Sequence, residues 1–182
     1  TQDEKEKAFR ITHASLHAET LRRNTEAQKA LALGNAIGEA VAFARDLVNE
    51  PAGLMTPTAL ADAAAKMGKA AGLQVTVHER KKIEQLKMGM FLAVAKGSQE
   101  PPKLIEIRYV PKGATAAKAK PLAFVGKAIT FDSGGLSLKP ADAMVDMKTD
   151  MAGSAAVFGA MFAIAHLAPD FPVHAYVGSC EN

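Results

Sequence analysis

The most informative segment of this sequence runs from residue 122 to residue 140 and reads LAFVGKAITFDSGGLSLKP. Its first residues are almost all apolar, which predicts a short strand of the kind that is buried within a sheet. Lys127, Asp132 and Lys139 follow among glycines and other small residues. Sites in α/β folds gather at the carboxyl ends of strands, so the segment predicts both a strand and a chemical site at its end.

Helices and short strands alternate on both sides of this segment. Apolar residues at helical spacing, with stop and start signals around them, predict helices over residues 27–48, 56–71, 79–87 and 151–167. Alternating patterns or short apolar runs predict strands over residues 8–16, 73–78, 104–110, 122–126 and 172–179. This order predicts an α/β fold with helices packed on a mostly parallel or mixed central sheet. Because the sequence stops just after the last of these strands, we expect the sheet to be incomplete in this chain.

Composition and charge exclude several classes of protein. With 48% hydrophobic and 23% charged residues the chain has globular composition, which excludes a disordered or collagen-like protein. The formal net charge is +3 and the basic residues are scattered, so we expect no nucleic-acid partner. The single cysteine, Cys180, excludes an internal disulfide and a cysteine-based zinc cage. We find no apolar run near the ~18 residues of a membrane span and therefore expect no membrane partner. A single cysteine suits a reducing compartment, and we expect a cytoplasmic protein.

The charged residues in and after this segment suit a metal-dependent hydrolase. Carboxylates such as Asp132 and Asp150 are hard oxygen donors for Mg, Mn or Zn, and two-metal hydrolytic sites share such carboxylates. Of the two lysines, Lys127 and Lys139, one could bind a metal if deprotonated, and the other, still charged, could stabilise a tetrahedral intermediate. The same residues also fit simpler roles: a plain turn at 132–135, a helix N-cap at Asp150, and two surface lysines.

Longer motifs distinguish between these interpretations. They are DLVNEP at residues 46–51, FLAVAKGS at 91–98, GKAITFDSGGLSLKP at 126–140 and MKTDMAGSAAV at 147–157. In this order they resemble the leucyl aminopeptidase (cytosol aminopeptidase) family. The resemblance implies that residues 24–182 form the first part of the metallopeptidase catalytic domain. Residues 1–23 would then be the end of an N-terminal domain or a connecting strand.

The resemblance implies a role for each matched residue. Lys127 would bind a metal through its neutral amine, Asp132 would bridge two metals, and Asp150 would be a further ligand of the metal that Lys127 holds. Lys139 would be the catalytic lysine that polarises the scissile carbonyl. Met147 would line the pocket for the first side chain of the substrate. These five residues are therefore the implied substrate-binding set, with two divalent ions (Zn, Mn or Mg) as cofactors.

The resemblance also implies what the chain needs from elsewhere. The third motif of the family, Asn-Thr-Asp-Ala-Glu-Gly-Arg, supplies the remaining Asp and Glu ligands and the catalytic arginine, and this sequence does not contain it. We therefore expect a complementary C-terminal segment as a partner, a homo-hexamer, and an inactive enzyme when this chain is alone. The implied function is a metal-dependent aminopeptidase that removes leucine-like N-terminal residues from peptides with a water activated by two metals. Two alternatives stay open: a DNA-binding architectural protein of the same fold, and a catalytically silent structural subunit.

Overall fold

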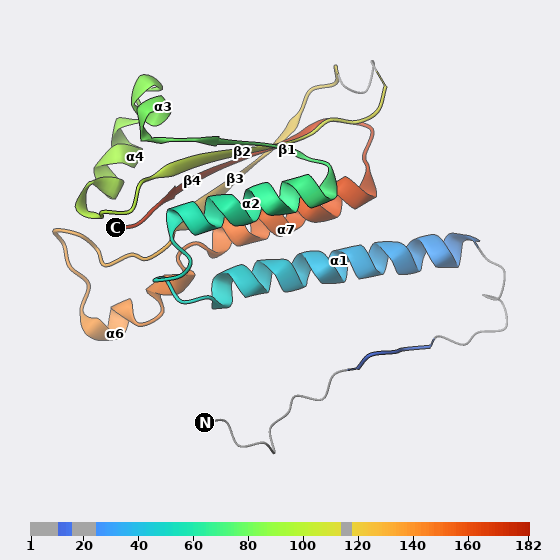
Figure 1. The fold of residues 1–182 in the computed structure, drawn as a ribbon, viewed down its shortest axis with the longest axis horizontal. Helices are drawn as coiled ribbons and strands as arrows, with labels where there is room; N and C mark the ends of the chain where they lie inside the picture. The colour runs from blue at the N-terminus through green and yellow to red at the C-terminus, as the bar shows by residue number, and fades with distance from the viewer. Residues whose placement is uncertain (1–10, 16–24, 114–117) are drawn as a thin grey trace. The chain divides into compact units, whose positions relative to one another are not determined.

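The computed structural model describes residues 11–15, 25–113 and 118–182 (Figure 1). The chain divides into two compact units, Thr1–Ala32 and Leu33–Asn182. In the first unit, residues 11–15 form neither helix nor strand, and the rest of the strand predicted over 8–16 lies outside the described residues. The domain division expected after residue 23 stays a prediction. The predicted site residues all belong to the second unit.

A mixed four-stranded sheet forms the centre of the second unit. Its strands are β1 (Gln74–His78), β2 (Lys103–Tyr109), β3 (Leu122–Ile129) and β4 (Val173–Cys180), and they lie in the order β1-β2-β4-β3. Strand β2 is antiparallel to β1 and to β4, whereas β3 is parallel to β4. The predicted α/β class is confirmed, and of the two sheet types that we expected the mixed type is correct.

The predicted helices are all present, with ends shifted by a few residues. The observed helices are α1 (Thr25–Asn49), α2 (Pro57–Ala71), α3 (Arg80–Gln85), α4 (Gly89–Val94), α6 (Ala141–Met144) and α7 (Ala152–Leu167), with 3₁₀ turns η3 (Ala95–Gly97) and η4 (Met147–Thr149). Figure 1 shows α2 and α7 together on one face of the sheet and α3 and α4 on the other side. Local signals explain α2 well: the Thr56 hydroxyl accepts a hydrogen bond from the Ala59 N–H (3.2 Å), and Gly72 closes the helix with φ +71°.

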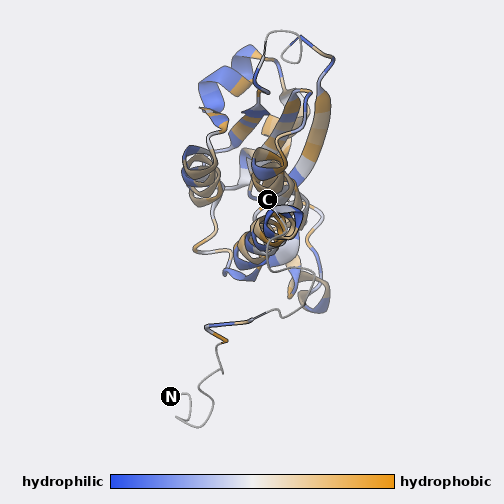
Figure 2. Cartoon of the chain, turned by 90° about the vertical axis from the view of Figure 1, so that its right-hand side faces the viewer, coloured by the Kyte–Doolittle hydropathy of each residue, from blue (hydrophilic) through white to orange (hydrophobic). Residues whose placement is uncertain are grey.

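The hydrophobic core lies between the sheet and the pair α2 and α7. Leu60 of α2, Ile105 of β2, Phe158 of α7 and Val177 of β4 are all fully buried there. Figure 2 shows apolar and polar residues within the same helices and strands, as expected for elements with one buried side. Burial against the core is what holds β3 and the start of α7 close to each other.

The segment Ala141–Leu167 is the one part of the described chain that is long and apolar enough, by length and composition, to be a candidate membrane span. It is divided into α6, η4 and α7, and α7 has 16 residues, fewer than the ~20 that a span needs. Phe158 and Met161 of α7 are fully buried in the core. Packing against the sheet therefore accounts for part of its apolar composition, since 39% of its most apolar window is buried.

Strand β3 lies at an open edge of the sheet. Among the described residues it pairs with β4 on one side only. Val125 in its middle is 81% exposed and Leu122 at its start is 48% exposed. An apolar strand with a free edge is a template for a further strand, and the sheet is open at β3.

Candidate metal and catalytic site

Backbone hydrogen bonds join the loop that carries Asp132 to the residues that follow β4. Asp132 follows β3, and Asn182 follows β4, which runs parallel to β3. The Asn182 N–H donates to the Phe131 carbonyl (3.0 Å), and the Ser133 N–H donates to the Asn182 carbonyl (2.9 Å). Backbone pairing therefore continues past both strands and holds Asp132 at the carboxyl end of the sheet.

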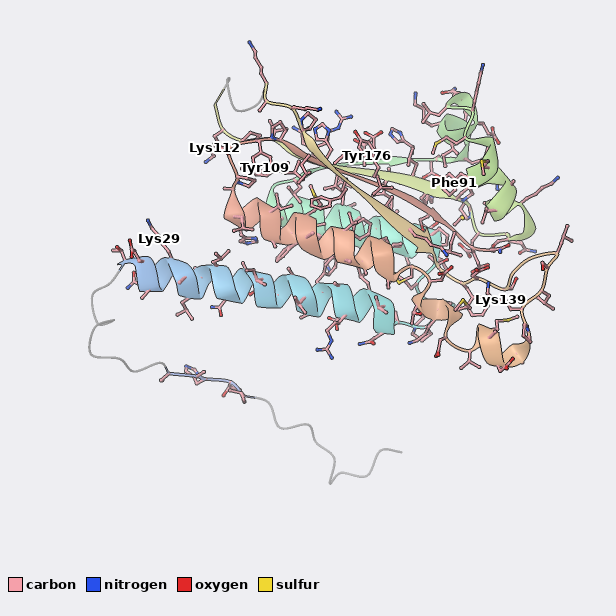
Figure 3. All side chains as sticks on the ribbon, turned by 180° about the vertical axis from the view of Figure 1, so that it is seen from behind. Lys29, Phe91, Tyr109, Lys112, Lys139 and Tyr176 are labelled. Carbon is pink, nitrogen blue, oxygen red and sulfur yellow. The ribbon has the colours of Figure 1, made fainter. Side chains whose placement is uncertain are left out.

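Asp132 is an ionised carboxylate with donors on both oxygens. Lys139 Nζ donates to Oδ2 (2.5 Å), while Oδ1 accepts from the Gly134 N–H (3.0 Å) and from Asn182 Nδ2 (2.8 Å). The hydrogen bond from the Lys139 ammonium holds the pKa of Asp132 below its usual range; burial opposes this effect, and Asn182 and Gly134 reinforce it. Figure 3 shows Lys139 at the end of the sheet near α6.

The glycines after Asp132 are required by the path of the loop. Gly134 has φ +92° and Gly135 has φ +70°, a region that favours glycine. A Cβ on Gly134 would overlap the carbonyl oxygen of Ser137. The Lys139 N–H donates to the Ser133 carbonyl (2.8 Å), which closes the loop. The segment is thus a turn, as its composition also allowed, and this turn returns Lys139 to Asp132.

Lys127 and Asp150 form a second pair. Lys127 Nζ lies 2.8 Å from both carboxylate oxygens of Asp150, but only the contact with Oδ1 has hydrogen-bond geometry. Oδ2 is buried and has no hydrogen-bond partner in the described part of the chain. The side chain of Lys127 is 61% exposed and that of Asp150 is 20% exposed. Met151, not Asp150, occupies the N-cap position of α7, so the simple capping role is wrong for Asp150.

A close approach of β3 and α7 brings this second pair together. A Cβ on Gly126 would lie 3.0 Å from the Gly153 carbonyl oxygen and from Ser154 Cα. A Cβ on Gly153 would lie 3.2 Å from the backbone nitrogen of Lys127. Lys127 directly follows Gly126, and Asp150 lies three residues before Gly153. Because neither glycine has a side chain, β3 and α7 approach closely enough for the Lys127 amine to reach the Asp150 carboxylate.

One residue of each ion pair affects the pKa of Cys180. Burial raises the pKa of its thiol to about 11, the negative charge of Asp132 adds to this rise, and the positive charge of Lys127 opposes it.

Each predicted metal-binding aspartate contacts a lysine, and no three His, Cys, Asp or Glu side chains of the described chain form a metal-binding group. The structure therefore unites the predicted residues as two ion pairs, and their ligand roles stay predictions. Met147 lies half-buried in η4, and its pocket role also stays a prediction.

These motifs and this fold match known proteins. The family model described as "Cytosol aminopeptidase family, catalytic domain" matches residues 42–182. The chain belongs to the cytosol aminopeptidase family. The family resemblance predicted from the sequence motifs is thus confirmed.

Relatives of this cytosol aminopeptidase chain are much longer than it is. The probable cytosol aminopeptidase of Solibacter usitatus is 53% identical over 157 residues, which cover 86% of this chain and 32% of the relative. The probable cytosol aminopeptidase of Acidobacterium capsulatum is 51% identical over 156 residues, which cover 86% of this chain and 30% of that relative. The bottromycin maturation enzyme BotP in complex with Mn has a TM-score of 0.79 and 38% identity, covering 92% of this chain and 37% of BotP. The chain thus spans about a third of the length of these proteins.

Sequence reasoning missed one side chain of the site, Asn182. Its amide contacts Asp132 across 50 residues of chain. The available signal was its place directly after a strand, since side chains that follow adjacent parallel strands meet at one edge of a sheet. That signal is useful only when β3 and β4 are known to be neighbours.

Proposed function

We propose that this chain is the first part of the catalytic domain of a cytoplasmic metal-dependent aminopeptidase, which removes leucine-like N-terminal residues from peptides. The observation that carries the proposal is the gathering of Lys127, Asp132, Lys139 and Asp150 into two lysine–aspartate pairs at one end of the sheet. Membership of the cytosol aminopeptidase family and the Mn complex of BotP support it.

The donor set fits a divalent cation. Asp150 Oδ2 is buried and has no partner with hydrogen-bond geometry in the described part of the chain, and the positive charge of Lys127 lies 2.8 Å from it; a divalent cation could take the place of that charge. The lowered pKa of Asp132 keeps that carboxylate ionised at neutral pH, as a metal ligand must be. Lys127 can bind a metal only as a neutral amine, and its contact with Asp150 puts the two groups within reach of one ion.

Each residue then has a separate task. Lys127, Asp132 and Asp150 would hold two divalent ions of Mn, Zn or Mg, with Asp132 shared between them. Such ions, when bound, polarise a carbonyl and make a water acidic enough to attack it. Lys139, as an ammonium, would donate a hydrogen bond to the oxygen of the scissile carbonyl and stabilise the negative charge that develops there. Met147 would contact the first side chain of the peptide.

We further propose that the site is completed by a complementary C-terminal segment, which supplies an Asp, a Glu and an Arg, and that the active form is a homo-hexamer. The chain spans 32% of the length of the Solibacter usitatus relative, and β3 presents a free edge on which Val125 is 81% exposed. A further strand on this edge would pair its free backbone N–H and C=O groups. This chain alone would then be inactive.

The test is a carboxylate deletion in the assembled protein, meaning this chain together with the completing segment. Asp132→Ala should abolish hydrolysis of leucine p-nitroanilide. Asp142→Ala, which removes an exposed carboxylate from the first turn of α6, is the matched control and should retain activity. Unchanged turnover of Asp132→Ala with normal metal content would reject the proposal. Salt-dependent binding of duplex DNA by a protein without peptidase activity would favour the DNA-binding alternative.

A further inference from the structure

We propose that Asn182 is a positioning residue for Asp132: its side-chain amide holds the carboxylate in the orientation in which it binds a divalent cation. The inference rests on the function proposed above. It adds a residue that belongs to neither lysine–aspartate pair and to none of the motifs quoted from the sequence.

The backbone places Asn182 beside Asp132 by two hydrogen bonds. The Asn182 N–H donates to the carbonyl of Phe131, and the Asn182 carbonyl accepts from the N–H of Ser133. These partners are the residues directly before and directly after Asp132. Asn182 is therefore held opposite Asp132 by main-chain groups alone, and replacement of its side chain leaves these two bonds in place.

The amide itself is held in one orientation. Asn182 Nδ2 donates to Asp132 Oδ1 at 2.8 Å. On its other side, Asn182 Oδ1 lies against Gly135, where a Cβ would come within 2.9 Å of it. Gly135 has φ +70°, so glycine suits both the backbone and the space there. The amide oxygen thus faces a glycine and the amide nitrogen faces the carboxylate.

The two oxygens of the Asp132 carboxylate have different hydrogen-bond donors. Asn182 and the Gly134 N–H hold Oδ1, whereas Lys139 holds Oδ2. In the proposed mechanism Lys139 acts on the substrate, so its hydrogen bond to Asp132 would be weakened or lost during the reaction. The donors on Oδ1 do not depend on Lys139 and can hold the carboxylate while Lys139 moves. Hydrogen bonds of this kind to metal-binding side chains are typically worth about 10- to 100-fold in metal affinity or activity.

The experiment measures Mn²⁺ binding to the assembled protein by isothermal titration calorimetry, without substrate. Asn182→Ala removes the amide, and Asn182→Leu keeps a similar volume but has no donor. Both should raise the dissociation constant for Mn²⁺ by about 10- to 100-fold. The control is Glu181→Gln, one residue away, whose side chain accepts from Ser98 Oγ (2.6 Å) and, in the described part of the chain, has no hydrogen bond with Asp132. It should bind Mn²⁺ as the wild type does.

The possible outcomes separate this inference from the proposed function. If the wild type binds Mn²⁺ and both Asn182 variants bind it within twofold of the wild type, the positioning role is wrong and the proposed function stands. If Asn182→Ala binds weakly and Asn182→Leu binds normally, the side chain only fills space, which also overturns the inference. If the wild type binds no Mn²⁺, the proposed function fails and this inference fails with it.

Discussion

Replacement of Gly126 by alanine tests the close contact of β3 and α7 that brings Lys127 to Asp150. The new methyl carbon would lie 3.0 Å from the Gly153 carbonyl oxygen, from Ser154 Cα and from Val157 Cγ2. Two of these three atoms belong to the backbone at the start of α7, so rotation of a side chain cannot relieve the overlap. Strand and helix must move apart by a few tenths of an ångström.

The expected loss of stability follows from two opposing effects. Overpacking of a well-packed contact costs about 1–3 kcal/mol. A glycine-to-alanine change regains about 0.4–1 kcal/mol, because the unfolded chain has less freedom to lose. The midpoints of these two ranges differ by about 1.3 kcal/mol, so we expect a net loss of that size in the free energy of unfolding, or roughly 3–5 °C in melting temperature for a domain of 150–250 residues.

The assay is urea unfolding of the assembled protein followed by circular dichroism. Gly178→Ala is the matched control, because Gly178 lies opposite Lys127 on β4 and a Cβ there would meet the Phe91 ring at an ordinary 3.5 Å. Because it meets no overlap, it should not destabilise the protein and should gain about 0.4–1 kcal/mol in the free energy of unfolding. The reasoning is refuted if Gly126→Ala is as stable as the wild type, or if both variants lose the same stability.

Two further predictions concern titratable groups. The pKa of Asp132 is lower in the folded protein than in the unfolded chain, so its stabilising effect is complete above the ordinary value of 3.8 and is lost as the pH falls through the folded value. Asp132→Asn should therefore flatten the fall in unfolding free energy below about pH 4 in urea titrations, and an unchanged slope would contradict this cause. The Cys180 thiol, buried and with a pKa of about 11, should react with 5,5′-dithiobis(2-nitrobenzoic acid) at pH 8 only after unfolding. Rapid reaction of the native protein would show that the thiol is accessible.

Local signals were sufficient to predict α1, α2, α3 and α7, but not the short helices α4 and α6. Helix α2 begins at Pro57 after the capping Thr56 and ends before Gly72. Each of these signals lies within one turn of the helix end that it determines, so it can be recognised in the local sequence. The start of α7 was less well predicted: Asp150 fitted an N-cap by residue type, but its carboxylate contacts Lys127 instead. A long-range ion pair can override a local preference, and local sequence contains no information about it.

Strand direction and the pairing of charges depended on contacts that sequence periodicity does not contain. The same alternating pattern suits a strand in either direction, so the antiparallel pairing of β2 with β4 could not be read from it. The sequence motifs predicted Lys127, Asp132, Lys139 and Asp150 as one group. Which lysine contacts which aspartate is decided by the loop that returns Lys139 to Asp132, and by the glycines that bring β3 to α7.

The open edge of the sheet and the candidate site lie on the same strand. Lys127 belongs to β3, and its side chain is 61% exposed beside an edge that has no partner strand among the described residues. If the proposed completing segment pairs with this edge, it also removes water from around Lys127. Desolvation favours the uncharged form of an amine, which is the form that can bind a metal. Completion of the sheet and preparation of the metal ligand would then be one event, which gives a physical reason why this chain alone should be inactive.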